Sequence, residues 1–353
     1  MKVLDILIIN GNSLGYFNKD EVDLMKNEIY DLTIIGGGPV GIYGAFYAGM
    51  HGMKTKIIDA LPELGGQLAA LYPEKYIYDL PGHPKIKAGE MVEQLKVQMN
   101  QFTDRIDVVT NTNVKTVEKL EDGTFKICTD QECHYSRSIV ITAGNGAFTP
   151  RKLDVGGAEQ FTNIHYFVST MEIFKGKDVV IFGGGDSAVD WALMLDGVAK
   201  SVSIVHRRNE FRAHASSVEK LKQANVTCLT PYIVKDVMGQ GDRANQVELI
   251  NVDTEETKIL SVDEIIVLYG FISSLGPIKN WDIELEKNAL RVDITQQTSV
   301  SGIFAAGDAC TFDGKIKMIT TGFGEVVVAI NAAIAYAYPD KVHRHKHSSA
   351  MMK

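Results

Sequence analysis

Two glycine-rich stretches, each lying between an apolar run and a helix-forming segment, constrain the fold of this chain more than any other feature. The first, in DLTIIGGGPVGIYGAFYAGMHGMKTKIIDA, places Gly36, Gly38 and Gly41 in the G-x-G-x-x-G spacing. We expect strands at Leu32–Ile35 and Thr55–Ile58, with a helix of small and apolar residues between them. The stretch therefore predicts nearly a complete βαβ unit of the kind that binds a dinucleotide.

The residues of this first loop suit the phosphates and the ribose of a nucleotide. Glycines permit a tight turn, close approach of the backbone to pyrophosphate and close packing of helix on strand. The helix that begins at Pro39 directs its free N–H groups and the positive end of its dipole at the phosphates. Asp59 ends the second strand, 18 residues after Gly41 (59 − 41), where a carboxylate accepts hydrogen bonds from a ribose diol. The glycine spacing alone also fits a purely structural strand-to-helix turn.

The second stretch, KDVVIFGGGDSAVDWALMLDGVAKSVSIVHRRNEFRA, repeats the pattern with the opposite charge at its end. We expect strands over residues 179–182 and 202–205, with Ala188 at the third loop position. Guanidinium groups after the second strand hold a 2′-phosphate by charge-assisted bonds, as in NADP sites. A solvated basic surface turn is the alternative interpretation of HRR. The predicted NADP residues are Gly183, Gly185, Asp186, Ser187, His206, Arg207, Arg208 and Arg212.

Two nucleotide sites of different preference predict FAD in the first and NADPH in the second. Residues 138–148, SIVITAGNGAF, and residues 301–311, SGIFAAGDACT, are expected strands that return beneath the FAD. Their order along the chain places the NADPH domain inside the FAD domain. The predicted fold is α/β, with two Rossmann-like domains. We expect residues 25–147 and 277–353 to form the FAD domain, residues 148–276 to form the NADPH domain, and residues 1–24 to be an extension ahead of Met25.

Charge, apolar runs and cysteines exclude several classes of function. A formal net charge of −8 argues against a general nucleic-acid binder, which needs a basic face. No apolar run is expected to span a membrane. The spacing of Cys128, Cys133, Cys228 and Cys310 fits neither a metal site nor a disulfide framework, so we expect reduced thiols in the cytoplasm.

From about Tyr30 to its C-terminus the chain resembles the thioredoxin-reductase-like ferredoxin–NADP reductases of bacteria. The motifs that carry the resemblance are GGGPVG, LPELGGQLAALYPEKYIYDLPG, ITAGNGAF, GGGDSAVDWALML, HRRNEFRAH, YGFISSLGPIKNW and AAGD. The resemblance implies a two-dinucleotide-binding flavoprotein that assembles as a homodimer. It also implies FAD contacts by Gln67, Tyr72, Asp79, Val114, Ala143, Gly144, Phe148, Asp308 and Ser349.

The same resemblance implies that Tyr72 and His347 stack on the two faces of the flavin. Tyr72 lies in the LYPEK motif, and His347 lies in the C-terminal tail HRHKHSSAMMK. A buried or interfacial aromatic is the alternative for Tyr72. A solvated terminus is the alternative for the tail, because it carries three histidines, His343, His345 and His347.

Thioredoxin reductases carry a redox-active Cys-x-x-Cys pair just ahead of a glycine loop like the second one. In this chain the same place is occupied by Phe167, Val168, Ser169 and Thr170. The expected route is a hydride from NADPH to FAD N5, then single electrons through a flavin semiquinone to ferredoxin or flavodoxin. Such a reaction needs no acid–base side chain and no metal. An acidic carrier requires a local basic patch, for which the candidates are Lys54, Lys56, Lys85 and Lys87.

Two other functions share these binding motifs. An NADPH-dependent flavin or quinone reductase, a diaphorase, differs only in its electron acceptor. A non-catalytic FAD- and NADPH-binding redox sensor would control a partner and reduce its flavin slowly. A thioredoxin reductase that uses distant cysteines is disfavoured, because Cys228 and Cys310 have no neighbouring cysteine in the sequence. We also expect hinges near residues 144–146 and 270–274.

Overall fold

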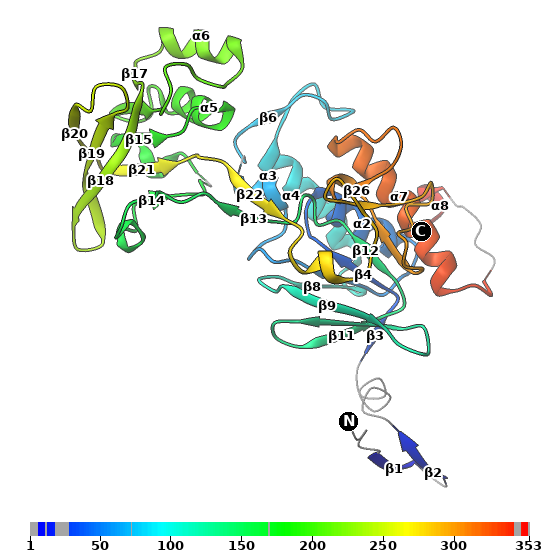
Figure 1. Ribbon diagram of the computed structural model, residues 1–353. Helices are drawn as coiled ribbons and strands as arrows, with labels where there is room; N and C mark the ends of the chain where they lie inside the picture. Colours follow the sequence, from blue (N-terminus) through cyan, green and yellow to red (C-terminus); the bar gives the residue numbers. More distant parts are fainter. Residues whose placement is uncertain are drawn as a thin grey trace. The chain divides into compact units, whose positions relative to one another are not determined.

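The computed structural model describes residues 6–10, 13–17, 28–71, 73–168, 170–341 and 347–351, and gives only the backbone of residues 6–10, 13–17, 147–149 and 272–273. The chain forms two compact units, drawn in Figure 1. Unit 1 comprises residues 1–69, 75–147 and 274–353, and unit 2 comprises residues 70–74 and 148–273. Apart from the short stretch 70–74, the chain leaves unit 1 after residue 147 and returns after residue 273, where the sequence predicts a return after 276. Both crossings lie in β13 (Ala147–Pro150) and β22 (Phe271–Ser274), which pair as a two-stranded sheet.

Unit 1 is built on a parallel sheet whose strand order is β25-β12-β4-β5-β8. Strands β4 and β5 have the bounds that the sequence predicts, and each is completely or largely buried because helices and a second sheet cover the two faces. The strands are β4 (Leu32–Ile35), β5 (Thr55–Ile58), β8 (Ile106–Val109), β12 (Ile139–Ile141) and β25 (Ile303–Ala305).

The two faces of this sheet pack into separate cores. Leu32, Ile34 and Ile57 pack against the helices, whereas Ile35 and Ile58 pack against the sheet β3-β11-β10-β9 and the segments near Trp281. The alternation follows from the two-residue period of a strand. The helices are α2 (Pro39–Met50), α3 (Gly66–Leu71), α4 (Ala88–Met99), α7 (Ile319–Ala337) and α8 (Ser348–Met351). The smaller strands are β3 (Ile29–Tyr30), β6 (Tyr76–Ile77), β7 (Ile86–Lys87), β9 (Val114–Lys119), β10 (Phe125–Thr129), β11 (Cys133–Ser136), β23 (Leu285–Glu286), β24 (Ala289–Arg291) and β26 (Cys310–Thr311).

The prediction that all cysteines are reduced thiols is wrong for one pair. Strands β10 and β11 form a hairpin in which Cys128 lies directly opposite Cys133, and the two form a disulfide. The Cα atoms are 4.0 Å apart, because the intervening turn of four residues makes them a cross-strand pair. Spacing along the chain could not reveal this contact. Cys228 and Cys310 are free thiols, exposed and buried respectively.

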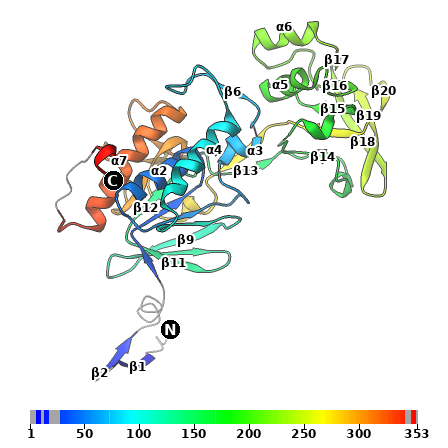
Figure 2. The same ribbon diagram turned by 180° about the vertical axis from the view of Figure 1, so that it is seen from behind.

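The prediction that no apolar run is long enough to cross a membrane also needs correction. Helix α7 meets this criterion by length and composition, with a mean hydropathy of 1.4. Five of its apolar side chains, Val326, Ala329, Ile330, Ala333 and Ile334, belong to the core beside α2. Figures 1 and 2 show α2 and α7 packed side by side. These side chains form the face of α7 that packs within unit 1, and 39% of its apolar window is buried there.

Unit 2 repeats the parallel architecture with the strand order β14-β21-β15-β16-β17. One face of the sheet packs against helices α5 (Asp186–Leu195) and α6 (Ala215–Gln223) in one hydrophobic core. The other face packs against an antiparallel meander in a second core. The sheet strands are β14 (Ile164–His165), β15 (Asp178–Phe182), β16 (Ser201–Val205), β17 (Val226–Leu229) and β21 (Glu264–Val267). The meander consists of β18 (Tyr232–Gln240), β19 (Arg243–Asn251) and β20 (Thr257–Ser261).

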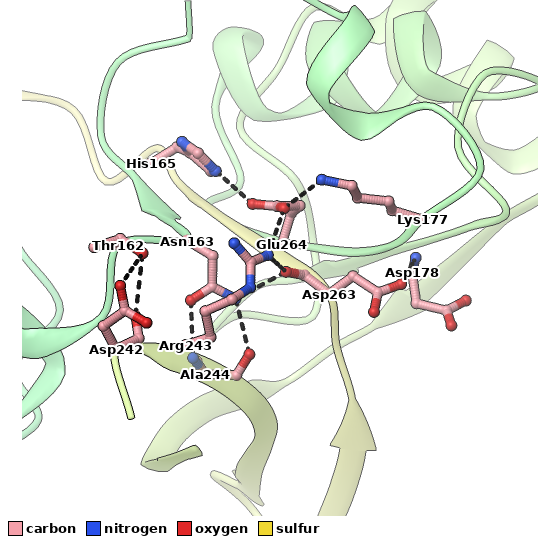
Figure 3. A network of polar contacts seen from close by, with 10 residues as sticks. All are labelled: Thr162, Asn163, His165, Lys177, Asp178, Asp242, Arg243, Ala244, Asp263 and Glu264. Carbon is pink, nitrogen blue, oxygen red and sulfur yellow. Dashed lines mark hydrogen bonds and ion pairs between the residues drawn. The ribbon is translucent and has the colours of Figure 1, made fainter. Parts of the chain in front are cut away.

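A buried carboxylate ties the amino ends of the unit 2 strands to the meander. Glu264, 4% exposed at its side chain, contacts His165 Nε2 at 2.7 Å and accepts hydrogen bonds from Lys177 Nζ at 2.6 Å and Arg243 Nη2 at 2.8 Å. Figure 3 shows the three groups converging on this carboxylate. Beside it, Asn163 exchanges two hydrogen bonds of 2.8 Å with the Ala244 backbone. The carboxyl ends of the same strands, where the glycine loop begins, lie at the opposite edge of the sheet.

Replacing Glu264 with Gln should destabilise unit 2 by about 2 kcal/mol, because it leaves partly buried cations without their counter-charge. Burial raises the pKa of Glu264, but its hydrogen bonds to His165, Lys177 and Arg243 outweigh this and hold the pKa below 4.5. The stabilisation is therefore present above pH 4.5 and disappears as the pH falls through the folded-state pKa. Urea unfolding of both proteins between pH 3 and pH 7 measures the difference. Glu219→Gln, which breaks an exposed pair with Lys222, should change stability by less than about 0.5 kcal/mol. An equal effect of the two substitutions would contradict this role for Glu264.

The N-terminal segment should be dispensable for folding of the two units. Strands β1 (Ile6–Asn10) and β2 (Ser13–Phe17) pair only with each other among the described strands. Deletion of residues 1–24 should leave the bound FAD per chain and the midpoint of thermal unfolding unchanged. Absorbance at 450 nm and a thermal melt measure these quantities, and loss of either would show that the hairpin belongs to the fold.

Candidate functional site

The first glycine loop joins β4 to α2 and combines tight packing with an open face. A Cβ atom at Gly36, whose φ is +109°, would lie 2.7 Å from the Ala143 backbone, and one at Gly41 would lie 2.0 Å from the Gly36 carbonyl oxygen. At Gly38, by contrast, no atom lies within 4 Å of the Cβ position. Gly38 caps α2 and Pro39 follows at its first turn. The loop thus offers a helix N-terminus with free space above it, which fits a pyrophosphate.

Asp59 holds this loop in place from the end of β5. Its side chain accepts hydrogen bonds from the backbone N–H of Gly37 and, at 2.7 Å, from that of Leu61. Burial raises the pKa of Asp59, while the N–H groups of Leu61 and Gly37 oppose the rise. The sequence predicts only a ribose contact for this residue. The structure adds a second task, because the carboxylate fixes the glycine loop itself.

The carboxyl ends of β12 and β25 lie at the same edge of the sheet. Thr142 donates a hydrogen bond from Oγ1 to the Gly36 carbonyl at 2.6 Å, so Ala143 and Gly144 directly follow a contact with the glycine loop. Asp308 lies in the turn after β25, half-buried, and forms no hydrogen bond or ion pair within the described residues. The structure therefore brings the first glycine loop, Asp59 and the end of β12 together, and it leaves the Asp308 carboxylate free for a ligand.

Other predicted FAD residues are less closely gathered. Gln67 lies in α3, and Val114 is buried at the start of β9. Asp79 is exposed, and its carbonyl accepts a hydrogen bond from Thr320 Oγ1 at 3.1 Å. His347 and Ser349 are exposed at α8. Tyr72, His343 and His345 lie outside the described residues, as does the side chain of Phe148.

Two residues that sequence reasoning missed lie behind the turn of Asp308. Lys315 Nζ and Glu325 Oε1 form a buried ion pair at 2.6 Å. The sequence does not show that these two residues meet. Its one signal is Glu325 itself, a charged residue within an otherwise apolar helical segment.

The second glycine loop joins β15 to α5 and is closed by His206. A Cβ atom at Gly184 would lie 2.2 Å from His206 Nδ1, so the imidazole packs directly on this glycine. The ring stacks on Phe211, with centroids 5.6 Å apart and an interplanar angle of 19°. Burial, and then the charge of Arg207, lower the pKa of His206. The neutral imidazole supports the segment that carries the arginines.

Hydrogen bonds tie that segment to the second loop. The Arg212 N–H donates to the Gly184 carbonyl at 2.6 Å, and the His214 N–H donates to Asp186 Oδ1 at 2.8 Å. Asp186 therefore fixes the position of the loop. A carboxylate would repel a phosphate, so its charge alone would not suggest this residue for a phosphate site. Ser187 follows it in the first turn of α5, and no atom lies within 4 Å of a Cβ position at Gly185.

Three guanidinium groups are available beside this loop. Arg207, Arg208 and Arg212 are all exposed, and none pairs with a carboxylate in the part of the chain that the structure describes. The carboxylate of the first site and the arginines of the second therefore differ in sign, as in a pair of sites for an unphosphorylated and a 2′-phosphorylated ribose. Within the described residues, no group of three or more His, Cys, Asp or Glu side chains could hold a metal ion.

The segment at residues 167–170 holds no cysteine. Val168 is buried in the core of unit 2, and the Phe167 ring lies 5.7 Å from that of Phe271. Ser169 lies outside the described residues. The disulfide joins β10 to β11 in unit 1, whereas residues 167–170 belong to unit 2.

Comparisons with known proteins agree with this arrangement. Residues 30–333 match the model of the family described as pyridine nucleotide-disulphide oxidoreductase. The chain is 52% identical over 330 residues to "Ferredoxin--NADP reductase 2" of Listeria monocytogenes, covering 93% of this chain and 99% of that protein. It is also 52% identical to "Ferredoxin--NADP reductase" of Geobacillus thermodenitrificans, covering 92% and 97% respectively.

Among solved structures, thioredoxin reductases are similar to this chain. That of Lactococcus lactis (FR conformation) is 26% identical with a TM-score of 0.69, covering 88% of this chain and 99% of that one. That of T. acidophilum is 25% identical with a TM-score of 0.69, covering 89% and 99%.

The free arginines generate a binding prediction. Replacing Arg207 and Arg208 together with Ala should weaken binding of 2′,5′-ADP 10- to 100-fold, because charge-assisted bonds to the 2′-phosphate are lost. Binding of 5′-AMP should change less than threefold. Isothermal titration calorimetry measures both ligands, and Arg151→Ala, also at an exposed arginine of unit 2, serves as the control. Equal losses of affinity for the two nucleotides would show that the arginines do not bind the 2′-phosphate.

Proposed function

This chain belongs to the pyridine nucleotide-disulphide oxidoreductase family, and we propose that within it the chain acts as a ferredoxin–NADP reductase. The observation that carries the proposal is the combination of two nucleotide loops of opposite charge with no cysteine pair at residues 167–170. The thioredoxin reductases that the chain resembles pass their electrons to a Cys-x-x-Cys pair at this place in the sequence. Because residues 167–170 hold no such pair, we take the acceptor to be an external carrier.

The residues of unit 1 fit FAD. The open face at Gly38 and the N-terminus of α2 suit its pyrophosphate, and Asp59 its adenosine ribose. The free carboxylate of Asp308 suits a hydroxyl of the ribityl chain. Bound FAD supplies the chemistry of accepting two electrons from NADPH and releasing them singly, so the protein needs no acid–base side chain for the transfer.

The residues of unit 2 fit NADPH. The N-terminus of α5, capped by Gly185, is suited to its pyrophosphate. Arg207, Arg208 and Arg212 hold the 2′-phosphate, and the stacked His206 keeps their segment against the loop. The protein thereby selects NADPH over NADH by charge, since only the 2′-phosphate of NADPH forms charge-assisted bonds with the three guanidinium groups.

Contacts to the flavin ring complete the proposed FAD site. Tyr72 stacks on one face and His347 on the other, with Ser349 as a polar neighbour of His347. Gln67 and Asp79 lie near the ring, Val114 borders the adenine, and Phe148 borders the isoalloxazine. Likeness to the ferredoxin–NADP reductases supports these roles.

The proposed partner is ferredoxin, with flavodoxin as a second carrier, and the proposed assembly is a cytoplasmic homodimer. Of the candidate docking residues, Lys54 pairs with Glu28, and Lys56 Nζ lies 4.4 Å from the Tyr30 ring centroid, beside His134. These two lysines have partners within unit 1. Lys85 is exposed, with its ammonium 4.9 Å from the Tyr76 ring centroid, and suits an acidic surface better.

Anaerobic NADPH oxidation with purified ferredoxin as the sole acceptor tests the function. We expect two ferredoxins reduced per NADPH consumed, because the carrier takes one electron and the hydride supplies two. Visible absorbance of ferredoxin and absorbance at 340 nm measure the ratio. Rapid bleaching of the flavin by NADPH without electrons reaching ferredoxin or flavodoxin would contradict the proposal and favour a flavin or quinone acceptor.

A further inference from the structure

A buried ion pair lies behind the turn at the carboxyl end of β25. Lys315, in the segment between β26 and α7, places Nζ 2.6 Å from Glu325 Oε1 on α7. The two side chains are 5% and 8% exposed. A pair so fully removed from water has a large desolvation cost, and apolar side chains of similar size stabilise a core at least as well. Its presence here therefore calls for a role other than general stability.

Both charges bind the backbone of one residue, Gly307. Glu325 Oε2 accepts a hydrogen bond from the Gly307 N–H at 2.8 Å, and Lys315 Nζ donates one to the Gly307 carbonyl at 2.8 Å. Gly307 has a φ of +72°, in the left-handed region. One ion pair thus binds both the donor and the acceptor of a buried residue at the point where the strand ends, and the same carbonyl also accepts from the Cys310 N–H.

Helix packing holds the same residue from another side. A Cβ atom at Gly307 would lie 3.3 Å from Val40 Cγ2, in the first turn of α2. A Cβ atom at Gly322, on α7, would lie 2.7 Å from Val40 Cγ2 and 3.3 Å from the Gly307 Cα atom. Gly307 is therefore wedged between the helix that follows the first glycine loop and the helix that carries Glu325.

We propose that Lys315 and Glu325 are positioning residues for FAD, which fix the Gly307 backbone so that the next residue, Asp308, presents its free carboxylate to the cofactor. The inference rests on the proposed function, because it takes FAD as the ligand of unit 1. It assigns the ion pair to the cofactor site through the Gly307 backbone, to which both side chains bond.

A neighbouring thiol reports on the charges of the pair. Cys310 Sγ lies 3.7 Å from Lys315 Nζ and 3.8 Å from Glu325 Oε2, and it donates to the Gly307 carbonyl at 3.4 Å. Burial raises the pKa of Cys310 to about 12, with opposing effects from Lys315 and Glu325. Removing one charge at a time should change its thiolate fraction in opposite directions.

The experiment compares Glu325→Gln, Lys315→Met and the double variant, with Glu286→Gln as a control at a half-buried ion pair of unit 1. The dissociation constant of FAD is measured on the full chain by flavin fluorescence after dilution. We expect each single variant to raise it at least tenfold, the double variant to raise it less than the product of the two, and the control to change it less than twofold. Far-UV circular dichroism of each full-chain variant verifies that both units, including unit 1 with the substitutions, remain folded.

Alkylation of Cys310 distinguishes positioning by charge from a packing defect. In a Cys228→Ser background, which removes the exposed thiol, the rate at pH 9 should rise for Glu325→Gln and fall for Lys315→Met. Faster alkylation in both variants would indicate simple loosening and overturn the proposal. Wild-type affinity for FAD in folded single variants would overturn it as well. A wild-type chain that binds no FAD would instead contradict the proposed function and this inference together.

Discussion

The hydrogen bonds from Gly37 and Leu61 to the buried Asp59 carboxylate are the contacts on which the first cofactor site depends. They hold the glycine loop against the end of β5, so that α2 starts with its N-terminus toward open space. Parallel pairing of β4 with β5 and β12 brings all three strand ends to the same edge. The site is therefore a consequence of sheet direction, and Asp59 supplies its rigidity.

In unit 2 the glycine loop is held in place by other groups. Its second strand ends in His206 instead of an acid, and the loop is held by the Gly184 carbonyl, which accepts from Arg212, and by the Asp186 carboxylate, which accepts from His214. Because no carboxylate follows this strand, the exposed arginines are not paired there and can bind a phosphate. One architecture thus serves two nucleotides, and the sign of a few side chains distinguishes them.

Buried ion pairs occupy different places in the two units. The Glu264 cluster lies at the amino ends of the unit 2 strands, away from the glycine loop, and it connects sheet and meander. The Lys315–Glu325 pair lies at the carboxyl end of β25, where parallel α/β sheets bind their ligands. The positions of the two groups in their sheets therefore indicate different roles. The Glu264 cluster stabilises unit 2, and the Lys315–Glu325 pair shapes a ligand site.

The sequence by itself determined the two βαβ units, the bounds of β4 and β5, and the opposite charges after the two glycine loops. These features are local, because glycine spacing, strand period and a terminal acid or base act within a few dozen residues. Only the tertiary structure decided that Cys128 faces Cys133 and that Lys315 and Glu325 enclose Gly307. Each of these depends on strand register or on packing between elements distant in the chain, which no local pattern encodes.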